Sequence, residues 1–401
     1  MAHQPHKIPW DLVASLIRWS DGKPKECVSN STSLHPGSTD NTWNQLHEFS
    51  ASFARVLDEA VESARAKYPA KYHPPAENEV LLDDRIIRKI EDDLIQWRES
   101  PHAIETGVDK SIPIPREMRI KSAFFHDNPP DSHYRFNKVD GKGLFNIEII
   151  KLLIIHDEME PVLRACAHEY AQAMRYETGW RMLHEHALSA YLSLNTIYCL
   201  PEYWDPAAGG TPGKDYRSTR SYQSMLRGCT ALGKTSEIVN YPHRNFFGIA
   251  PDQFHAMGPR VADKQRWLNK LDFDSQSGTI KKNHYGVLPF DDFITLENPK
   301  PQHIPNASDV TTVQGILLRH LPFELVLLIM ERARYTDRRA LTIPHDPLHP
   351  LNRQALDAYL EHCWQILVRC RMLAKETHPY RGTWDFRIKE GIRKLWVVPV
   401  R

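Results

Sequence analysis

The longest helical pattern in the chain covers residues 145–200, and it constrains the fold more than any other feature. Apolar side chains recur there at three- and four-residue spacing, beginning with the apolar run IIKLLII at 149–155. The same periodicity predicts five further helices, over residues 8–20, 43–68, 81–100, 309–335 and 352–375. Only 18 glycines stand against 29 prolines, which favours helices joined by stiff loops.

Strand signals are few and short. Residues 201–300 are the least periodic part, and we expect short strands at 284–290 and 394–401. No alternating strand–helix–strand pattern and no internal repeat occur. The predicted fold class is therefore mainly α, a multi-helix globular domain with irregular proline-rich loops and a few short strands.

Proline-rich and polar breaks divide the chain into three predicted parts. Residues 1–42 form an N-terminal helix and a mobile loop, and residues 43–305 form the main helical domain. Residues 306–401 form a C-terminal helical segment that we expect to pack on the main domain. Within that segment the sequence PHDPLHP, at 344–350, predicts a rigid connection.

The charge balance excludes two classes of protein. Lys and Arg number 51 and Asp and Glu 50, so the chain is neither a strongly basic nucleic-acid coat nor an acidic tail. The N-terminus lacks a long apolar core, and no stretch approaches the ~20 apolar residues of a membrane span. We expect no signal peptide, no membrane contact and a cytoplasmic location. Six scattered cysteines without a CxxC pair predict neither a disulfide framework nor a zinc finger.

The first candidate site is the acidic sequence His156-Asp157-Glu158-Met159-Glu160. If one helix continued through it, Asp157 and Glu160 would share a face, and His156 and Glu160 would be neighbours. Close carboxylates bind guanidinium or ammonium groups, and mutual repulsion raises the pKa of one of them toward values useful for a general base. The same spacing is also typical of a solvated helix end.

Histidines offer a second candidate. Four of them, His156, His168, His184 and His186, lie in the long helical block among glutamates. Helical bundles build di-metal sites from Glu and His three residues apart on two helices, and that pair is absent. Since His184 and His186 are two apart, they point to different sides of a helix. We therefore expect buried or interface histidines and predict no metal site.

Residues 228–235, GCTALGKT, match the phosphate-loop pattern GxxxxGK[ST], with Lys234 and Thr235 at its end. A phosphate loop needs a buried strand before it and a helix after it. The preceding RSTRSYQSMLR does not have the composition of a strand, and Pro242 follows within two turns. A phosphate-loop NTPase is therefore a minor alternative to an ordinary surface loop.

The segment from His320 to Tyr335, HLPFELVLLIMERARY, resembles the start of an F-box, with Pro322 in the first helical turn. Residues 364–372, WQILVRCRM, loosely resemble the helix that closes such a module. This alternative describes an adaptor that binds a ubiquitin-ligase partner. An amphipathic core helix with a proline start explains the same residues.

The sequence HDEMEP and residues 338–375 resemble the fungal arginine-containing cyclodipeptide synthases, and the resemblance extends over most of the chain. It implies an enzyme of secondary metabolism that takes arginine from arginyl-tRNA and a second amino acid from another aminoacyl-tRNA. The product is a cyclic dipeptide, a 2,5-diketopiperazine. Since aminoacyl esters are already activated, no cofactor or metal is implied.

The same resemblance implies an essential DDxxE motif. Asp157 and Glu160 match its second and last acids, whereas His156 stands in place of the first Asp. We expect Asp157 and Glu160 to bind the arginine or the reacting amine, with His156 and Glu158 as auxiliary residues. A DDxxE pattern also occurs in helical terpene synthases, but the second metal motif of that class is missing.

The tRNA partners require a positive surface for their phosphates. Four segments of the chain are rich in Lys and Arg: DRIIRKIEDD, KDYRSTR, ERARYTDRR and FRIKEGIRK. Solvated helix surface explains each of them equally well.

Overall fold

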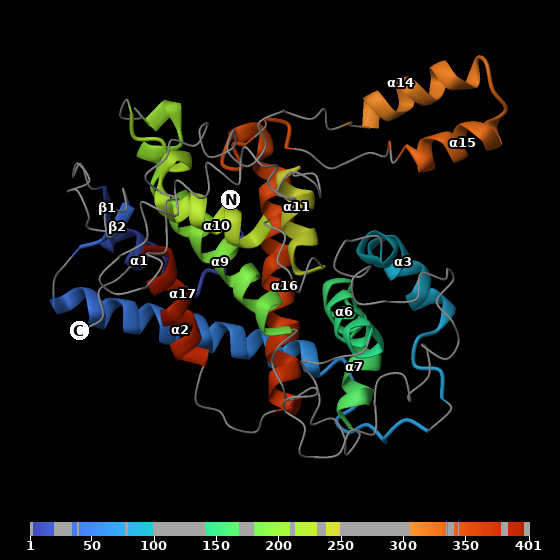
Figure 1. Ribbon diagram of the computed structural model, residues 1–401. Coiled ribbons are helices and arrows are strands. Elements are labelled where there is room, and N and C mark those ends of the chain that lie inside the picture. Colours follow the sequence, from blue (N-terminus) through green and yellow to red (C-terminus); the bar gives the residue numbers. More distant parts are fainter. Residues whose placement is uncertain are drawn as a thin grey trace, which may run out of the picture.

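The structure of the chain is a computed structural model (Figure 1). It describes residues 3–19, 34–37, 40–76, 79–98, 141–167, 180–208, 213–230, 238–248, 305, 307–333, 335, 341–343, 345–377 and 384–396.

Helix α9 (Trp180–Tyr198) lies at the centre of the fold, and most of its side chains are buried. Helix α16 (Arg353–Thr377) packs along α9 and also contacts α2 (Asp40–Arg65). Helix α17 (Trp384–Trp396) crosses α2 and α9, as Figure 1 shows. Segments far apart in the sequence therefore share one core.

Aromatic side chains from four helices meet inside this core. The ring of Trp10, on α1 (Trp10–Leu16), lies 5.5 Å from Phe49 of α2 and 5.7 Å from Tyr191 of α9, centroid to centroid. Tyr191 in turn lies 5.4 Å from Trp364 of α16. Edge-to-face and tilted ring contacts of this kind add to the free energy of apolar burial.

A glycine permits the close crossing of α17 and α9. A Cβ atom at Gly391 would lie 3.1 Å from Cδ2 of Leu188 and 3.4 Å from Cδ1 of Leu192. A side chain at this position would require Leu188 and Leu192 to move from their packed positions.

Helices α3 (Asp84–Arg98), α6 (Gly141–Ile155) and α7 (Met159–Cys166) form a second group beside α16. The described part of α6 is apolar and buried, apart from an ion pair between Glu148 and Lys151. Both partners of that pair are almost wholly removed from solvent, so each charge depends on the other.

Smaller elements complete the body. Strands β1 (Ile17–Trp19) and β2 (Leu34–Pro36) pair antiparallel, with Ile17 opposite Pro36. Helix α10 (Arg220–Thr230) packs on α9, and α11 (Tyr241–Phe247) contacts α10 and α16. Single 3₁₀ turns lie at Pro201–Tyr203, Pro206–Ala208, Tyr216–Ser218, Ile238–Asn240 and Pro350–Asn352.

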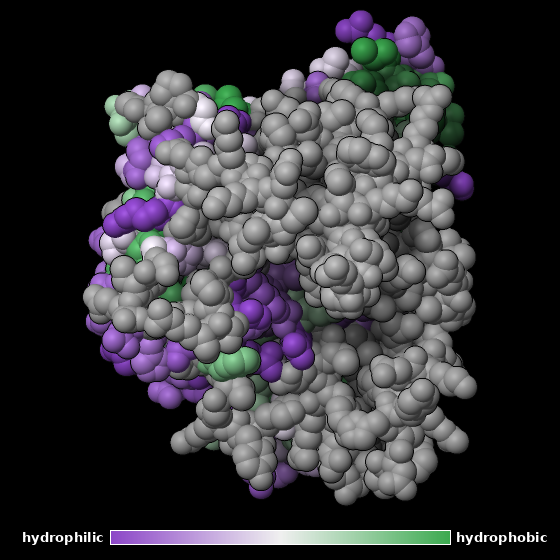
Figure 2. Space-filling view, turned by 60° about the vertical axis from the view of Figure 1, so that its left-hand side comes forward, coloured by the Kyte–Doolittle hydropathy of each residue, from purple (hydrophilic) through white to green (hydrophobic). Residues whose placement is uncertain are grey.

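Helices α14 (Ala307–Leu318) and α15 (Phe323–Arg332) form an antiparallel hairpin that projects away from the body (Figure 1). We call residues 307–333 the apolar hairpin. The two helices contact each other, and no residue of α14 is buried. In Figure 2 its green side chains lie at the upper right, beyond the rest of the surface.

The mainly α prediction is confirmed, with β1 and β2 as short strands. The helices predicted over 43–68, 81–100 and 352–375 correspond to α2, α3 and α16. The described part of the 145–200 block forms α6, α7 and α9. The three-part division of the chain stays a prediction. None of the described helices is long and apolar enough to cross a membrane.

Three expected elements differ from the structure. The helix predicted over 8–20 stops at Leu16, where β1 begins. The helix predicted over 309–335 is interrupted between α14 and α15, because Pro322 cannot continue the first helix.

The third is the C-terminal strand, which is wrong at 394–396. Those residues complete α17, because Ile388, Ile392 and Leu395 recur at helical spacing and are buried. The strand predicted at 284–290 and residues 397–401 lie outside the described residues.

Candidate functional site

The predicted site residues lie in a turn between α6 and α7, which we call the acidic turn (residues 156–160). Helix α6 ends at Ile155, and α7 begins at Met159, so no single helix continues through the motif. The shared helical face predicted for Asp157 and Glu160 is therefore wrong. The reversal occurs at Asp157, whose φ of 62° is left-handed.

The turn has the hydrogen bonding of a Schellman helix end. The backbone N–H of Glu158 donates to the carbonyl of Leu153 at 2.8 Å, and that of His156 donates to Leu152 at 2.9 Å. Glycine usually occupies the left-handed position, and here Asp157 does. A non-glycine residue in this conformation carries backbone strain, which other contacts must offset.

Arg369 of α16 supplies those contacts. Its Nε lies 2.8 Å from Oδ1 of Asp157, and its Nη1 donates to the carbonyls of Ile154 (3.0 Å) and Ile155 (3.2 Å). One guanidinium thus binds the aspartate and caps the last carbonyls of α6. Burial lowers the pKa of Arg369, and the nearby Asp157 carboxylate opposes that shift. The side chain of Asp157 itself is 59% exposed.

Glu158 is buried and held by two cations of α3. Arg85 donates in fork geometry, from Nη1 to Oε1 at 2.7 Å and from Nη2 to Oε2 at 2.8 Å. Lys89 adds a third bond of 2.8 Å to Oε1. The hydrogen bonds from Arg85, followed by those from Lys89, hold the pKa of Glu158 below its usual range against the effect of burial. Glu158 therefore stays charged and ties the turn to α3.

The two remaining residues differ in their surroundings. Nε2 of His156 lies 2.6 Å from Oδ2 of Asp93, on the last turns of α3. Glu160 lies in the first turn of α7 with its side chain exposed, and within the described residues it forms no ion pair. The structure thus brings His156, Asp157, Glu158 and Glu160 to one turn, with Asp157 and Glu160 exposed, His156 partly exposed and Glu158 buried.

Several described cations of the predicted basic segments have acidic partners. Arg217 binds Asp215 through 2.6 and 3.0 Å contacts, and Arg393 binds Glu390 at 2.6 and 2.7 Å. On α3, Arg85, Arg88 and Lys89 are all exposed, and their spacing places them on one side of the helix beside the acidic turn. This side of α3 is the described basic surface nearest the predicted site.

Of the histidines predicted to be buried or at an interface, His184 is buried, His186 is partly buried, and the side chain of His156 is 26% exposed. Burial lowers the pKa of His184 to about 3 and that of His186 to about 4. His168 lies outside the described residues. In the described part of the chain, no group of three His, Cys, Asp or Glu side chains is placed to hold a metal ion.

A buried histidine pair was missed by the sequence reasoning. His243 of α11 lies 6.2 Å from His186, centroid to centroid, and its Nδ1 lies 2.7 Å from the hydroxyl of Tyr359. Burial lowers the pKa of His243 well below the usual value and raises the pKa of nearby Cys363 to about 12. These groups are neutral at physiological pH, which suits a polar core contact better than a nucleophile.

The phosphate-loop segment starts inside a helix. Gly228 and Thr230 belong to the last turn of α10, and residues 231–235 lie outside the described residues. The buried strand that must precede a phosphate loop is replaced by that helix.

The two halves of the F-box resemblance are separated. Residues 323–332 form α15 of the apolar hairpin, whereas residues 364–372 lie within α16. In α16 the side chains of Trp364, Leu367 and Met372 belong to the main core. The helix expected to close the F-box module therefore packs in the main core instead.

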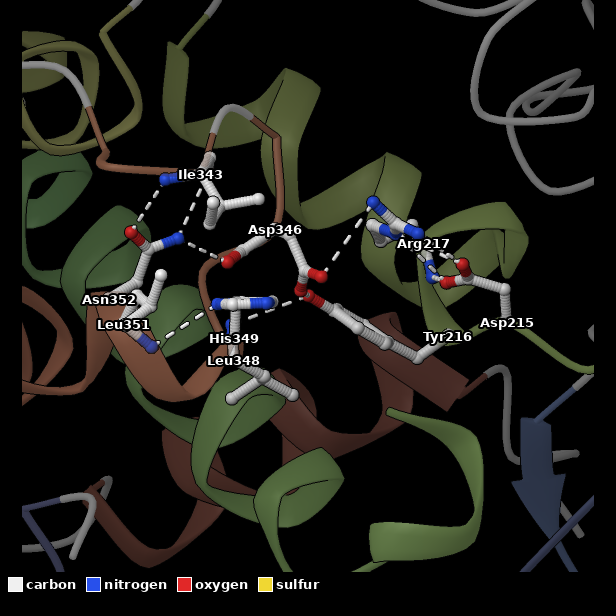
Figure 3. Close-up of polar contacts among 9 residues, drawn as sticks. All are labelled: Asp215, Tyr216, Arg217, Ile343, Asp346, Leu348, His349, Leu351 and Asn352. Atoms are coloured by element: carbon white, nitrogen blue, oxygen red, sulfur yellow. Dashed lines mark hydrogen bonds and ion pairs between the residues drawn. The ribbon is translucent and has the colours of Figure 1, made fainter. Parts of the chain in front are cut away.

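The connection that follows the hairpin is fixed to the body by polar contacts (Figure 3). Asn352 binds the N–H and carbonyl of Ile343 and the carbonyl of Asp346, at 2.6 to 3.0 Å. The hydroxyl of the buried Tyr216 donates to Oδ1 of Asp346 at 2.7 Å. The rigid connection predicted for 344–350 is thus explained by side-chain clamps as well as by its prolines.

Comparisons with known proteins give one match. Residues 11–398 match the family model described as gramillins biosynthetic cluster protein GRA5. No curated protein and no solved structure matches the chain.

Proposed function

Because the chain belongs to the GRA5 family of gramillins biosynthetic cluster proteins, a family of fungal secondary metabolism, we propose that it catalyses a step in making such a metabolite. The finer proposal is an aminoacyl-tRNA-dependent synthase. It joins arginine from arginyl-tRNA to a second amino acid and releases a cyclic dipeptide. The protein is then an enzyme without a metal or cofactor, whose partners are two charged tRNAs.

The observation that carries the proposal is the chemistry of the acidic turn. Two of its carboxylates already hold guanidinium groups, Asp157 that of Arg369 and Glu158 that of Arg85. Asp157 and Glu160 nevertheless keep exposed side chains. Carboxylates held in place beside a helix start are suited to bind the guanidinium or the ammonium group of an arginyl substrate.

The turn also has the rigidity that a catalytic group needs. Arg369, Arg85 and Lys89 fix its backbone and its buried glutamate from two different helices. In the proposed reaction an exposed carboxylate accepts a proton from the α-ammonium of one aminoacyl group. The freed amine attacks the ester carbonyl of the other aminoacyl group, the bond to the tRNA ribose breaks, and the ribose oxygen takes up a proton. A second attack of the same kind closes the ring and releases the second tRNA.

The exposed side of α3 supports the tRNA partners. Arg85, Arg88 and Lys89 lie beside the acidic turn, where phosphates of a bound acceptor stem would pass. Replacing Arg88, which is outside the Glu158 contacts, should weaken tRNA binding and flatten its salt dependence. Filter binding of Arg88→Ala at several salt concentrations tests this, and unchanged binding would count against α3 as the tRNA surface.

The direct test of the function is a reconstitution. The purified protein is mixed with total tRNA, ATP, a synthetase extract and isotope-labelled arginine, and products are analysed by mass spectrometry. We expect a labelled cyclic dipeptide that disappears when ribonuclease is added before the reaction. If folded protein gives no labelled dipeptide while arginyl-tRNA is present, the synthase proposal fails.

Neither alternative gains support. The phosphate-loop alternative lacks its strand, since α10 precedes the motif. The adaptor alternative lacks its closing helix, since residues 364–372 are part of the core. The exposed face of the apolar hairpin therefore needs a different explanation.

A further inference from the structure

The apolar hairpin holds most of the exposed apolar side chains of the described chain. Ten large hydrophobic residues in the described part are more than a third exposed, and seven of them lie on α14, α15 and the turn between them. Each of the seven is between 41% and 52% exposed. They are Ile316, Leu318, Phe323, Leu325, Leu327, Leu328 and Ile329. Among the α15 side chains that the structure describes, only Val326 and Met330 are buried.

These side chains cover more than one side of α15. Leu325, Leu328 and Ile329 are three and four residues apart and share one side, while Phe323 and Leu327 share another. A helix that is apolar on several sides is normally buried in a core. The hairpin therefore has the composition of an interior element but the location of a surface element.

The exposed area is large enough for a stable dimer. With about 200 Å² for a fully exposed large apolar residue, the seven residues present roughly 650 Å² of surface. A standard interface removes about 800 Å² from each partner, of which roughly 60% is apolar, or about 500 Å². The apolar sides of the hairpin together carry more than that area, so a second copy that covers both sides of α15 meets the requirement.

The described chain that follows the hairpin is anchored to the body. Asn352 clamps the returning chain at Ile343 and Asp346, and Asp346 is bonded to Tyr216 in the body (Figure 3). The hairpin projects away from the body in Figure 1, and α14 and α15 contact each other. A surface that is held out from the body is available to another molecule.

We propose that the hairpins of two copies of this chain pack together about a two-fold axis, forming an antiparallel four-helix bundle. Two antiparallel helices offer a self-complementary face, because the same ridges and grooves recur on both copies. Exposed charges of both signs, on Arg319, Glu324 and Arg332, flank the apolar residues, so like-charge repulsion does not oppose the pairing. A second copy thus covers the surface without a further protein.

Sedimentation velocity of the full chain over a wide concentration range tests the proposal. The monomer mass is 46.5 kDa, and we expect a species of twice that mass whose share grows with concentration. The double substitution Leu325→Glu/Leu328→Glu should raise the dimer dissociation constant more than tenfold. The matched control is Phe386→Glu on α17, which changes a residue of 63% exposure outside the hairpin and should leave the dimer intact.

Three outcomes overturn the proposal. The first is a wild-type chain that is monomeric at every concentration, which would mean that the hairpin binds a different protein. The second is a dimer that survives the double substitution, and the third is equal weakening by Phe386→Glu. Circular dichroism of each variant establishes that the body is folded, so a lost dimer is not mistaken for a lost fold.

Discussion

The acidic turn and the apolar hairpin differ in whether the rest of the described chain provides partners for their side chains. In the acidic turn, Asp157 and Glu158 find cationic partners on α16 and α3, helices that lie far away in the sequence. In the hairpin, seven large apolar side chains find no cover within the described chain. A charge with a partner of opposite sign stabilises the fold. A large apolar surface that the chain leaves uncovered indicates that another molecule binds it.

This difference predicts where the chain tolerates substitution. Residues of the body should respond to small changes, because they are packed at interior density. Residues of the hairpin should tolerate the same changes in the monomer, because little packs against them. The following predictions test that contrast in order of expected size.

The largest effect should come from equal truncations of two leucines. Leu367→Ala in α16 empties a fully buried site and should lower the free energy of unfolding by about 2–5 kcal/mol. Leu328→Ala removes the same atoms from a side chain that is 47% exposed. It should change the free energy of unfolding by less than about 0.5 kcal/mol. Urea unfolding at a concentration where the chain is monomeric compares them, and equal losses would mean that the hairpin belongs to the core.

Removal of Arg369 should come next. Arg369→Ala leaves the last carbonyls of α6 without their cap and Asp157 without its partner, so we expect a loss of about 2–3 kcal/mol. The matched control is Arg393→Ala, whose guanidinium is 43% exposed and binds the nearby Glu390. That control should cost less than about 0.5 kcal/mol in the same urea experiment. Similar losses would show that the clamp on the acidic turn is no stronger than a surface ion pair.

Acid should destabilise the body through its buried histidines. The pKa of His184 is lowered to about 3 and that of His186 to about 4, so the unfolded state binds more protons than the folded state below about pH 6.5. Stability from these groups is complete above that pH and falls as the pH drops, by about 1.4 kcal/mol per unit for each histidine. Unfolding measured between pH 7 and pH 5 isolates them from the carboxylates. His243, whose pKa burial also lowers, adds to the same trend. A flat profile in that window would contradict the burial of these rings.

The smallest effect concerns a glycine of the hairpin. A Cβ at Gly315 would meet nothing within 4 Å, so Gly315→Ala should favour helix α14 by at most about 1 kcal/mol. Amide hydrogen exchange should slow in α14 while the global unfolding midpoint stays unchanged. A shift of the midpoint by the same amount would show that hairpin and body unfold together.

The long helices could be predicted because the pattern that specifies each of them lies within its own segment of the sequence. The apolar spacing of α2, α3 and α16 is complete within each segment, and it gave both their type and their approximate extent. The C-terminal strand prediction is wrong at 394–396, because the helical spacing of Ile388, Ile392 and Leu395 continues to the end of α17. Short apolar runs near a chain end do not distinguish helix from strand by composition alone.

The acidic motif could be found from the sequence, but its geometry could not. The turn at Asp157 depends on Arg369, more than 200 residues away, and nothing local signals that contact. The same holds for Arg85 and Lys89, whose hydrogen bonds to the buried Glu158 no local pattern signals. The exposed Asp157 and Glu160 remain the candidates for chemistry.

The central claim is that the exposed carboxylates of the acidic turn act on the substrate while the buried one holds the turn. The most direct test compares initial rates of labelled dipeptide formation for the wild type and for Glu160→Gln, with Glu48→Gln on the exposed side of α2 as the matched control. We predict a loss of about 100-fold or more for Glu160→Gln, the usual contribution of a general base, and none for Glu48→Gln. A folded Glu160→Gln variant with the wild-type rate would contradict the account.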